Sequence, residues 1–63
     1  MAQISLKAAR VNAKLTQAEA AERINVAIST LKSWEKGITV PKQPQIEKIC
    51  SVYGVSYDAI FFG

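Results

Sequence analysis

The sequence contains no histidine, a single cysteine and only five acidic residues among its 63 positions. Without histidine there is no imidazole to act as a general base or to activate the Cys50 thiol, and one cysteine cannot form an internal disulfide. The acidic residues are spread along the chain without metal-ligand spacing, and no glycine-rich phosphate loop is present. These absences argue against an enzyme and predict no cofactor and no metal site.

Long apolar runs are also missing. No segment has the length of a membrane span, and no signal peptide is visible. The sequence therefore predicts a cytoplasmic protein that does not contact a membrane. Cys50 lies within an apolar helical pattern, which predicts a small core residue rather than a redox or catalytic one.

The residues that are present suit one small domain over positions 1–63. Apolar residues make up 49% of the chain, which is too many for a disordered segment. The net charge is +3 and the pI is about 9.3, so the composition mildly favours an acidic partner.

Local signals predict an all-α fold of five short helices, with no strand-like alternation. Thr16 and Glu19 form a capping box, Asn25 tolerates the left-handed conformation that ends a helix, and Gly37 suits a C-cap. Caps and apolar spacing place the helices at Leu6–Ala13 after Ser5, between Thr16 and Asn25, at Ile28–Lys36, from Pro44 to Gly54, and at Tyr57–Phe61 after Ser56. The second and third helices, joined by a tight turn, predict a unit that presents one helix to the edge of a DNA duplex.

The segment TQAEAAERINVAISTLKSWEKG, followed by IEKICSVYGVSYDAIF, resembles the Cro/repressor (XRE-type) helix-turn-helix family over roughly Leu6 to Phe61. The resemblance implies a compact five-helix repressor-like DNA-binding domain whose helix-turn-helix is formed by helices 2 and 3. Two residues depart from the family pattern, because Asn25 stands where glycine is usual and Ala20 where leucine is usual. Asn25 can make the same turn, whereas Ala20 leaves core volume that another side chain must fill.

The family's docking mode places the third helix in the major groove. On this mapping the base-reading candidates are Ala27, Ile28, Ser29, Lys32 and Ser33. Lys32 suits guanine O6 and N7, whereas Ser29 and Ser33 can bond several bases and so discriminate poorly. Ala27 could pack on a thymine methyl group. Ile28 is either a thymine-methyl contact or half-buried core, and some of the other candidates could approach only phosphate.

Phosphate contacts are predicted where cations or helix N-termini face the backbone of the duplex. The candidates are Gln17, Thr30 and Lys36, with Arg10, Lys14 and Lys42 as weaker ones. For Gln17 the alternative is an ordinary polar residue in a first helical turn. Arg10 lies on the core-facing stripe of its helix, where a lone cation would be costly. The resemblance implies that Arg10 pairs with Glu35, which would tie the first helix to the third and present Arg10 near a phosphate.

The C-terminal segment is unusually apolar. Either Ile60 and Phe61 complete the core while Phe62 frays, or Pro44, Tyr57 and Phe62 meet their copies in a two-fold dimer contact. The second alternative predicts a weak homodimer that is strengthened on a near-palindromic operator.

The function predicted from these features is sequence-specific binding of double-stranded DNA by a transcriptional regulator, a repressor of the phage or mobile-element type. The alternative is an antitoxin or another protein-interaction module built on the same fold. No small-molecule ligand is expected. Whether the chain is complete or is the DNA-binding domain of a longer repressor stays open.

Overall fold

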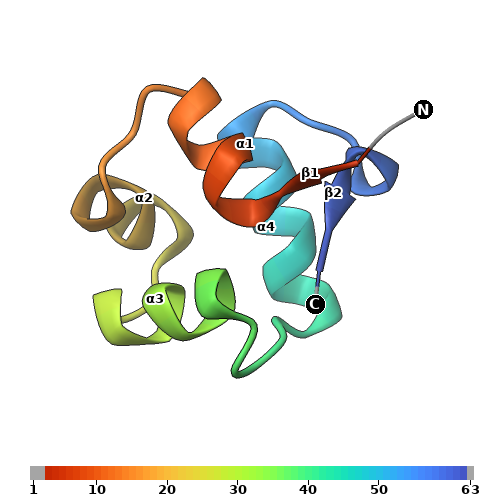
Figure 1. The fold of residues 1–63 in the computed structure, drawn as a ribbon. Helices are drawn as coiled ribbons and strands as arrows, with labels where there is room; N and C mark the ends of the chain where they lie inside the picture. The colour runs from red at the N-terminus through yellow and green to blue at the C-terminus, as the bar shows by residue number, and fades with distance from the viewer. Residues whose placement is uncertain (1–2, 63) are drawn as a thin grey trace.

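The structure is a computed structural model and describes residues 3–62; residues 1, 2 and 63 of the predicted domain lie outside this part. It contains α1 (Leu6–Asn12), α2 (Gln17–Ile24), α3 (Ile28–Lys36) and α4 (Gln43–Tyr53), then the short 3-10 helix η1 (Tyr57–Ala59). Strands β1 (Ile4–Ser5) and β2 (Ile60–Phe61), which come from the first and last parts of the described chain, lie side by side (Figure 1). No helix in residues 3–62 is both long and apolar enough to cross a membrane.

The predicted helix boundaries are confirmed for most of the chain. The Ser5 side chain accepts a hydrogen bond from the Ala8 N–H at the start of α1, and Thr16 and Glu19 form the predicted capping box of α2. Three residues at helix ends adopt the left-handed conformation, Asn25 after α2, Gly37 after α3 and Gly54 after α4. The first four helices thus begin and end where short-range capping chemistry places them.

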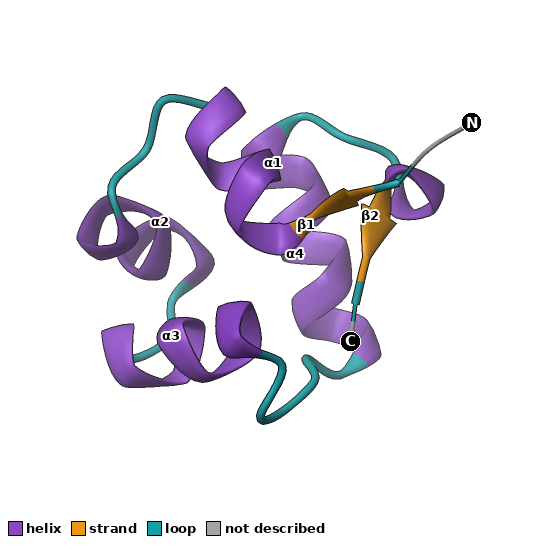
Figure 2. Ribbon diagram, in the orientation of Figure 1, coloured by secondary structure: helices purple, strands orange, loops and turns teal. Residues whose placement is uncertain are grey.

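The prediction of a fifth helix over Tyr57–Phe61 is wrong. After the single 3-10 turn the chain becomes extended, and β2 pairs in parallel with β1, with Ile4 opposite Ile60 and Ser5 opposite Phe61. Successive side chains of a strand point to opposite sides, so Ile60 is 2% exposed while Phe61 is 56% exposed. Phe61 therefore does not complete the core. Residues 3–62 form four α-helices, one 3-10 turn and a two-stranded sheet (Figure 2).

One apolar core joins all four helices and β2. Leu6, Ala9, Leu31, Ile49 and Tyr53 are buried in it. The remaining buried members are Leu15, Ala20, Ala21, Ile24, Trp34 and Ile60. Cys50 is half-buried and does not belong to this cluster, so the prediction that it is a core residue is wrong. Its partial burial raises the pKa of the thiol. The core holds α3 against α1 and α2 and so fixes the orientation of the helix-turn-helix.

Candidate nucleic-acid interface

The turn between α2 and α3 is short and internally bonded. Asn25 adopts φ 67°, and its N–H donates to the Glu22 carbonyl while the Val26 N–H donates to the Ala21 carbonyl at 2.9 Å. These two bonds form the helix ending that becomes possible when the residue after the helix adopts the left-handed conformation. Asn25 therefore performs the task that glycine performs in the family pattern.

The exposed side of α3 carries most of the predicted base-reading residues. Ile28, Ser29 and Lys32 are exposed, and Ser33 is half-buried. At about 100° per residue these four positions and Lys36 fall within an arc of about 140°. Ala27 is exposed at the N-cap and makes no side-chain capping bond. The structure thus brings the predicted readers together on one helix face and at its N-terminus.

The opposite side of α3 is anchored in the core. Leu31 is 0% exposed and Trp34 is 6% exposed. Ile28 is 42% exposed, so it lies at the solvent side of the helix rather than in the core. This contradicts the half-buried core alternative for Ile28 and leaves its methyl groups available at the start of the helix.

Glu35 connects three helices through its carboxylate. Arg10 Nε donates to Glu35 Oε2 at 2.7 Å, and Arg10 Nη2 lies 3.4 Å from Oε1. Gln17 Nε2 donates to the same Oε1 at 3.1 Å. Because the side chains of Arg10 and Glu35 are only 10% and 4% exposed, the predicted ion pair is present and belongs to the interior rather than to the surface. The pair fixes α1 and α2 to the C-terminal end of α3.

Arg10 has a further acceptor within the fold. Its Nη1 donates to the Leu15 carbonyl at 2.8 Å, just beyond the end of α1. The guanidinium is thus bonded on both sides, as a buried cation requires. Arg10 was also predicted to approach phosphate, but its side chain is 10% exposed and is directed inward to Glu35 and Leu15. Arg10 therefore contributes to the exposed face of α3 mainly by fixing the position of that helix.

Gln17 is the half-buried residue at the start of α2, and its bond to Glu35 was not predicted. The amide of Gln17 has a second N–H beyond the one that Glu35 accepts. The capping box uses the Thr16 and Glu19 N–H groups, and the backbone and side-chain hydrogen bonds of Thr16 lower the pKa of the Glu19 carboxyl. The N–H groups that the capping box leaves available at the start of α2 belong to Gln17 and to its neighbour Ala18.

The other predicted phosphate residues differ in exposure. Lys14, Lys36 and Lys42 are exposed, whereas Thr30 is half-buried on a different side of α3 from Lys32. Lys14 occupies the left-handed conformation at φ 61°, in the turn that ends α1. Its N–H donates to the Val11 carbonyl at 2.9 Å, so the chain reverses there toward α2.

Ser33 makes a contact that the sequence did not indicate. Thr39 Oγ1, in the loop after α3, donates to Ser33 Oγ at 3.1 Å. Two hydroxyls six residues apart have no regular periodicity that links them, so no sequence pattern could have found this bond.

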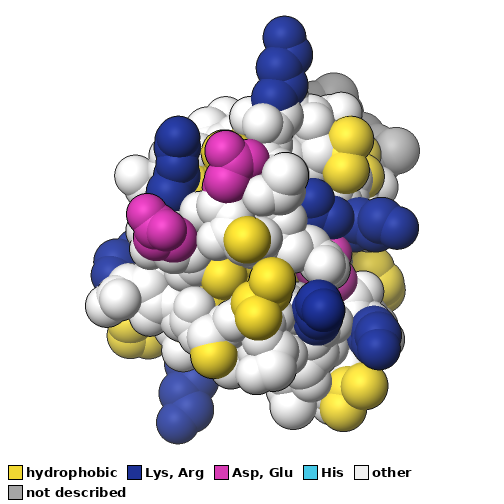
Figure 3. All heavy atoms as spheres, turned by 90° about the vertical axis from the view of Figure 1, so that its left-hand side faces the viewer, with side chains coloured by type: hydrophobic (Ala, Val, Ile, Leu, Met, Phe, Trp, Pro, Cys, Tyr) yellow, Lys and Arg dark blue, Asp and Glu magenta, His cyan; other side chains and the backbone are white. Residues whose placement is uncertain are grey.

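A space-filling view of the face with α2 and the start of α3 places apolar side chains at its centre and Lys and Arg side chains around its outline (Figure 3). The basic groups are dispersed over this face and do not form one continuous patch. This arrangement suits the modest net charge of +3.

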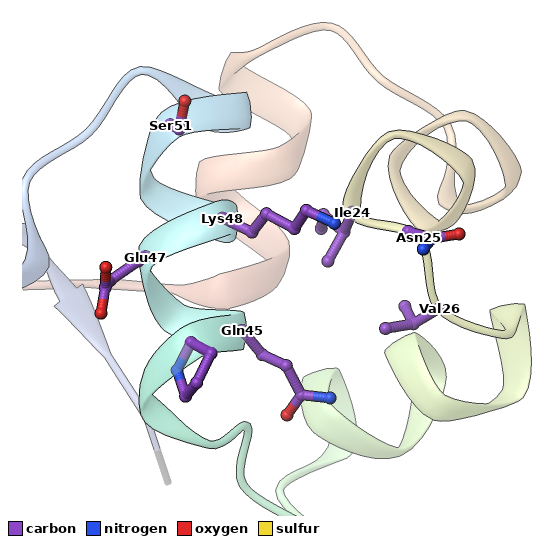
Figure 4. Close-up of a pocket in the computed structure, with 8 residues that line it drawn as sticks. Ile24, Asn25, Val26, Gln45, Glu47, Lys48 and Ser51 are labelled. Carbon is purple, nitrogen blue, oxygen red and sulfur yellow. The ribbon is translucent and has the colours of Figure 1, made fainter.

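A separate pocket of about 510 Å³ lies between the turn after α2 and the first turns of α4. Gln45 and Lys48 extend from α4 toward Asn25 and Val26, whereas Glu47 points away (Figure 4). None of the predicted base-reading or phosphate residues lines it. The pocket is therefore distinct from the face of α3, and no group of three or more His, Cys, Asp or Glu in residues 3–62 could hold a metal ion there or elsewhere.

The predicted dimer residues come from the first turn of α4, from η1 and from the residue that follows β2. Pro44 is exposed in the first turn of α4, and Tyr57 is 56% exposed in η1. Phe62 is half-buried against the core, and its ring stacks on Tyr57 with centroids 5.9 Å apart. The frayed position considered for Phe62 is therefore wrong, because the ring has both a core contact and an aromatic partner.

The family comparison agrees with this geometry. A family model described as "Helix-turn-helix" matches residues 6–60, which include all four α-helices. Neither the curated proteins nor the solved structures contain a significant match to the chain.

Proposed function

The chain belongs to the Cro/repressor (XRE-type) helix-turn-helix family of DNA-binding transcription regulators, and we propose that it represses transcription by occupying a specific double-stranded operator. The observation that carries this proposal is the exposed stripe on α3. Its residues Ile28, Ser29 and Lys32 are free of the core, while Leu31 and Trp34 hold the other side of the helix in place. A helix of this kind can enter the major groove without rearrangement of the domain.

Within this proposal Lys32 is the principal base reader. Its ammonium brings a cation and several donors to the guanine edge, where O6 and N7 both accept. Ala27 and Ile28 pack on thymine methyls, and Ser29 and Ser33 bond base edges. Repression needs no chemistry, because a protein bound over a promoter excludes other proteins from it. Such a repressor acts in the cytoplasm, where prokaryotic DNA is accessible.

Phosphate contacts position the domain on the duplex. We assign them to the exposed cations Lys14, Lys36 and Lys42, to Gln17 at the start of α2, and to Thr30. Arg10 supports this set from the interior through Glu35, which also holds Gln17. Three cationic contacts would give a slope of about −2.7 for log K against log salt concentration for each bound domain.

Selection of bound sequences from a random duplex pool, followed by binding of variants, tests the proposal. Lys32→Ala should weaken the best operator by about 1–3 kcal/mol and relax the preference at one base pair per half-site. Lys36→Ala should weaken all duplexes about equally and reduce the salt slope by about one unit. Lys48→Ala is the matched control, because it removes an exposed charge from α4 at the separate pocket.

The outcome that contradicts the assignment of Lys32 is specific. If Lys32→Ala lowered affinity for the operator and for random duplex by the same factor, Lys32 would contact phosphate and not a base. If the wild-type protein selected no sequence from the pool, the proposal of an operator-binding repressor would be wrong.

We propose further that two copies bind a near-palindromic operator through a weak contact of Pro44, Tyr57 and Phe62. Tyr57 is 56% exposed and stacks on Phe62, so the two rings offer one apolar surface. Two half-sites on one duplex raise the local concentration and favour a contact that is weak in solution. Tyr57→Ser should therefore reduce cooperative binding to the full operator and leave half-site binding intact, as measured by footprinting.

Phe61→Ser is the control for this test, since Phe61 is also 56% exposed but is not part of the proposed contact. Equal loss of cooperativity in the two variants would mean that the dimer contact is elsewhere on the C-terminal segment.

A further inference from the structure

The loop after α3 is attached to one residue of the reading helix, Ser33, by its backbone and by a side chain. Gly37 takes φ 78° and donates its N–H to the Trp34 carbonyl, and the Ile38 N–H donates to the Ser33 carbonyl at 3.0 Å. This ending turns the chain back over the last turn of α3. Thr39, the next residue, then donates from Oγ1 to Ser33 Oγ at 3.1 Å.

The bond from Thr39 changes what the Ser33 hydroxyl can do. A serine hydroxyl has one donor and two acceptor lone pairs, and within a helix it can also turn back to donate to a carbonyl of the preceding turn. The contact with Thr39 uses one hydrogen-bonding position of the Ser33 hydroxyl and holds Oγ on the side of the loop. The hydroxyl therefore has fewer ways to bond a base than a freely rotating serine.

We infer that Thr39 is a specificity-determining residue that fixes the side-chain rotamer of Ser33, and with it the position of the Ser33 hydroxyl beside the major groove. This inference rests on the proposed function, because it requires Ser33 to face a base. Each base pair presents a distinct set of donors and acceptors in the major groove, so a hydroxyl held in one position meets fewer of them with good geometry. Ser33 should therefore show a preference at one base pair that depends on Thr39.

This mechanism makes Ser33 a more selective reader than a freely rotating serine. Thr39 itself acts as a positioning residue, since its effect on the base passes through Ser33. Because Thr39 is exposed and its bond is at the surface, its removal should change base preference much more than it changes stability.

The first test needs no DNA. Scalar couplings between the α and β protons of Ser33, measured by NMR, should report one dominant side-chain rotamer in the wild-type protein and in Thr39→Ser. They should report rotamer averaging in Thr39→Val, which has nearly the same shape but no hydroxyl. Averaged couplings in the wild-type protein, or unchanged couplings in Thr39→Val, would overturn the inference whether or not the protein binds DNA.

The second test measures binding to duplexes that carry each base pair in turn across the selected operator half-site. Ser33→Ala and Thr39→Val should both relax the preference at the same single base pair, by about 3- to 10-fold, which is the range of one hydrogen bond. Thr39→Ser should retain the wild-type preference, and the double variant should be no more relaxed than Ser33→Ala. Ile38→Thr is the loop control, because Ile38 is 72% exposed and its side chain should leave every preference unchanged.

The two proposals fail in different ways. A wild-type protein that selects an operator, together with a Thr39→Val variant that keeps every base preference, refutes the role of Thr39 alone. A wild-type protein without any sequence preference refutes the proposed function and this inference with it.

Discussion

Removal of the Glu35 carboxylate should destabilise this domain far more than loss of a surface ion pair would. Exposed pairs contribute about 0–1 kcal/mol. The side chains of Arg10 and Glu35 are 10% and 4% exposed, and their closest atoms are 2.7 Å apart. Glu35→Ala therefore leaves a buried guanidinium that retains only the Leu15 carbonyl as acceptor.

The expected magnitude follows from the size of the domain. Breaking one side of a buried pair costs about 3–5 kcal/mol. At about 0.05–0.15 kcal/mol per residue, a chain of this length has about 3–9 kcal/mol of total stability. Glu35→Ala should thus remove a large share of the stability, and a substantial fraction of the variant should be unfolded at 37 °C. Arg10→Ala should cost less, because Gln17 still donates to the Glu35 carboxylate.

A double-mutant cycle in urea measures the interaction itself. Trp34 is the single tryptophan, is 6% exposed and precedes Glu35 in the chain, so its fluorescence reports unfolding near the pair. Arg10→Ala/Glu35→Ala should be more stable than the sum of the single variants predicts, by about 2 kcal/mol. Glu47→Ala, which removes an exposed carboxylate on α4, should stay within about 0.5 kcal/mol of wild type. A cost below about 1 kcal/mol for Glu35→Ala would refute the reasoning from burial, and strict additivity would mean that the two side chains do not interact.

Two further substitutions test conformational and pH effects. Lys14→Gly should stabilise the domain by about 1 kcal/mol in thermal unfolding, because Lys14 is held at φ 61°, a left-handed conformation that glycine adopts without steric cost. If Lys14 contacts phosphate, the same substitution should reduce the salt slope of DNA binding by about one unit. Tyr53→Phe should be neutral or stabilising at pH 7, because the buried Tyr53 hydroxyl has no hydrogen-bond partner among residues 3–62. Burial, followed by the nearby Glu35 charge, raises the pKa of Tyr53 from 10.0 to about 12. Ionisation of Tyr53 therefore favours the unfolded chain, and the free energy of unfolding falls as the pH rises from 10 toward 12. Urea midpoints between pH 7 and 12 should fall more steeply for wild type than for Tyr53→Phe; parallel curves would contradict the assignment to Tyr53.

The helices could be predicted because their ends are encoded over three or four residues. Thr16 and Glu19 bond each other's backbone, and Gly37 and Gly54 lie where a left-handed residue is needed. The β1–β2 pair could not be predicted in this way. Ile4 meets Ile60 across almost the whole chain, and strands of two residues are too short to show an alternating pattern. The apolar C-terminal residues were therefore assigned to a helix that does not form.

The candidate site shows the same division between local and long-range information. The exposed face of α3 follows from helical periodicity, which separates Lys32 from Leu31 and Trp34. The Arg10–Glu35 pair was expected because a cation on a core-facing stripe needs a partner, although the choice of Glu35 rested on the family resemblance. The bonds of Gln17 to Glu35 and of Thr39 to Ser33 depend on how separate parts of the chain meet in space. Nothing about a glutamine at position 17 or a threonine at position 39 indicated these partners.

The restraints on α3 all act away from its exposed stripe. Leu31 and Trp34 fix one side of the helix in the core, Glu35 joins its end to α1 and α2, and Gly37 turns the following loop back onto it. Ser29 and Lys32 take part in none of these contacts, so the free energy that positions the helix does not depend on them. Under the proposed function, such a fold can exchange the side chains assigned to base reading on this stripe with little loss of stability. Ser33, which borders the stripe, differs because its carbonyl and its hydroxyl are both bonded to the loop. Under its proposed role, base preference and helix ending are coupled at Ser33, and a change of this residue requires a compatible residue in place of Thr39.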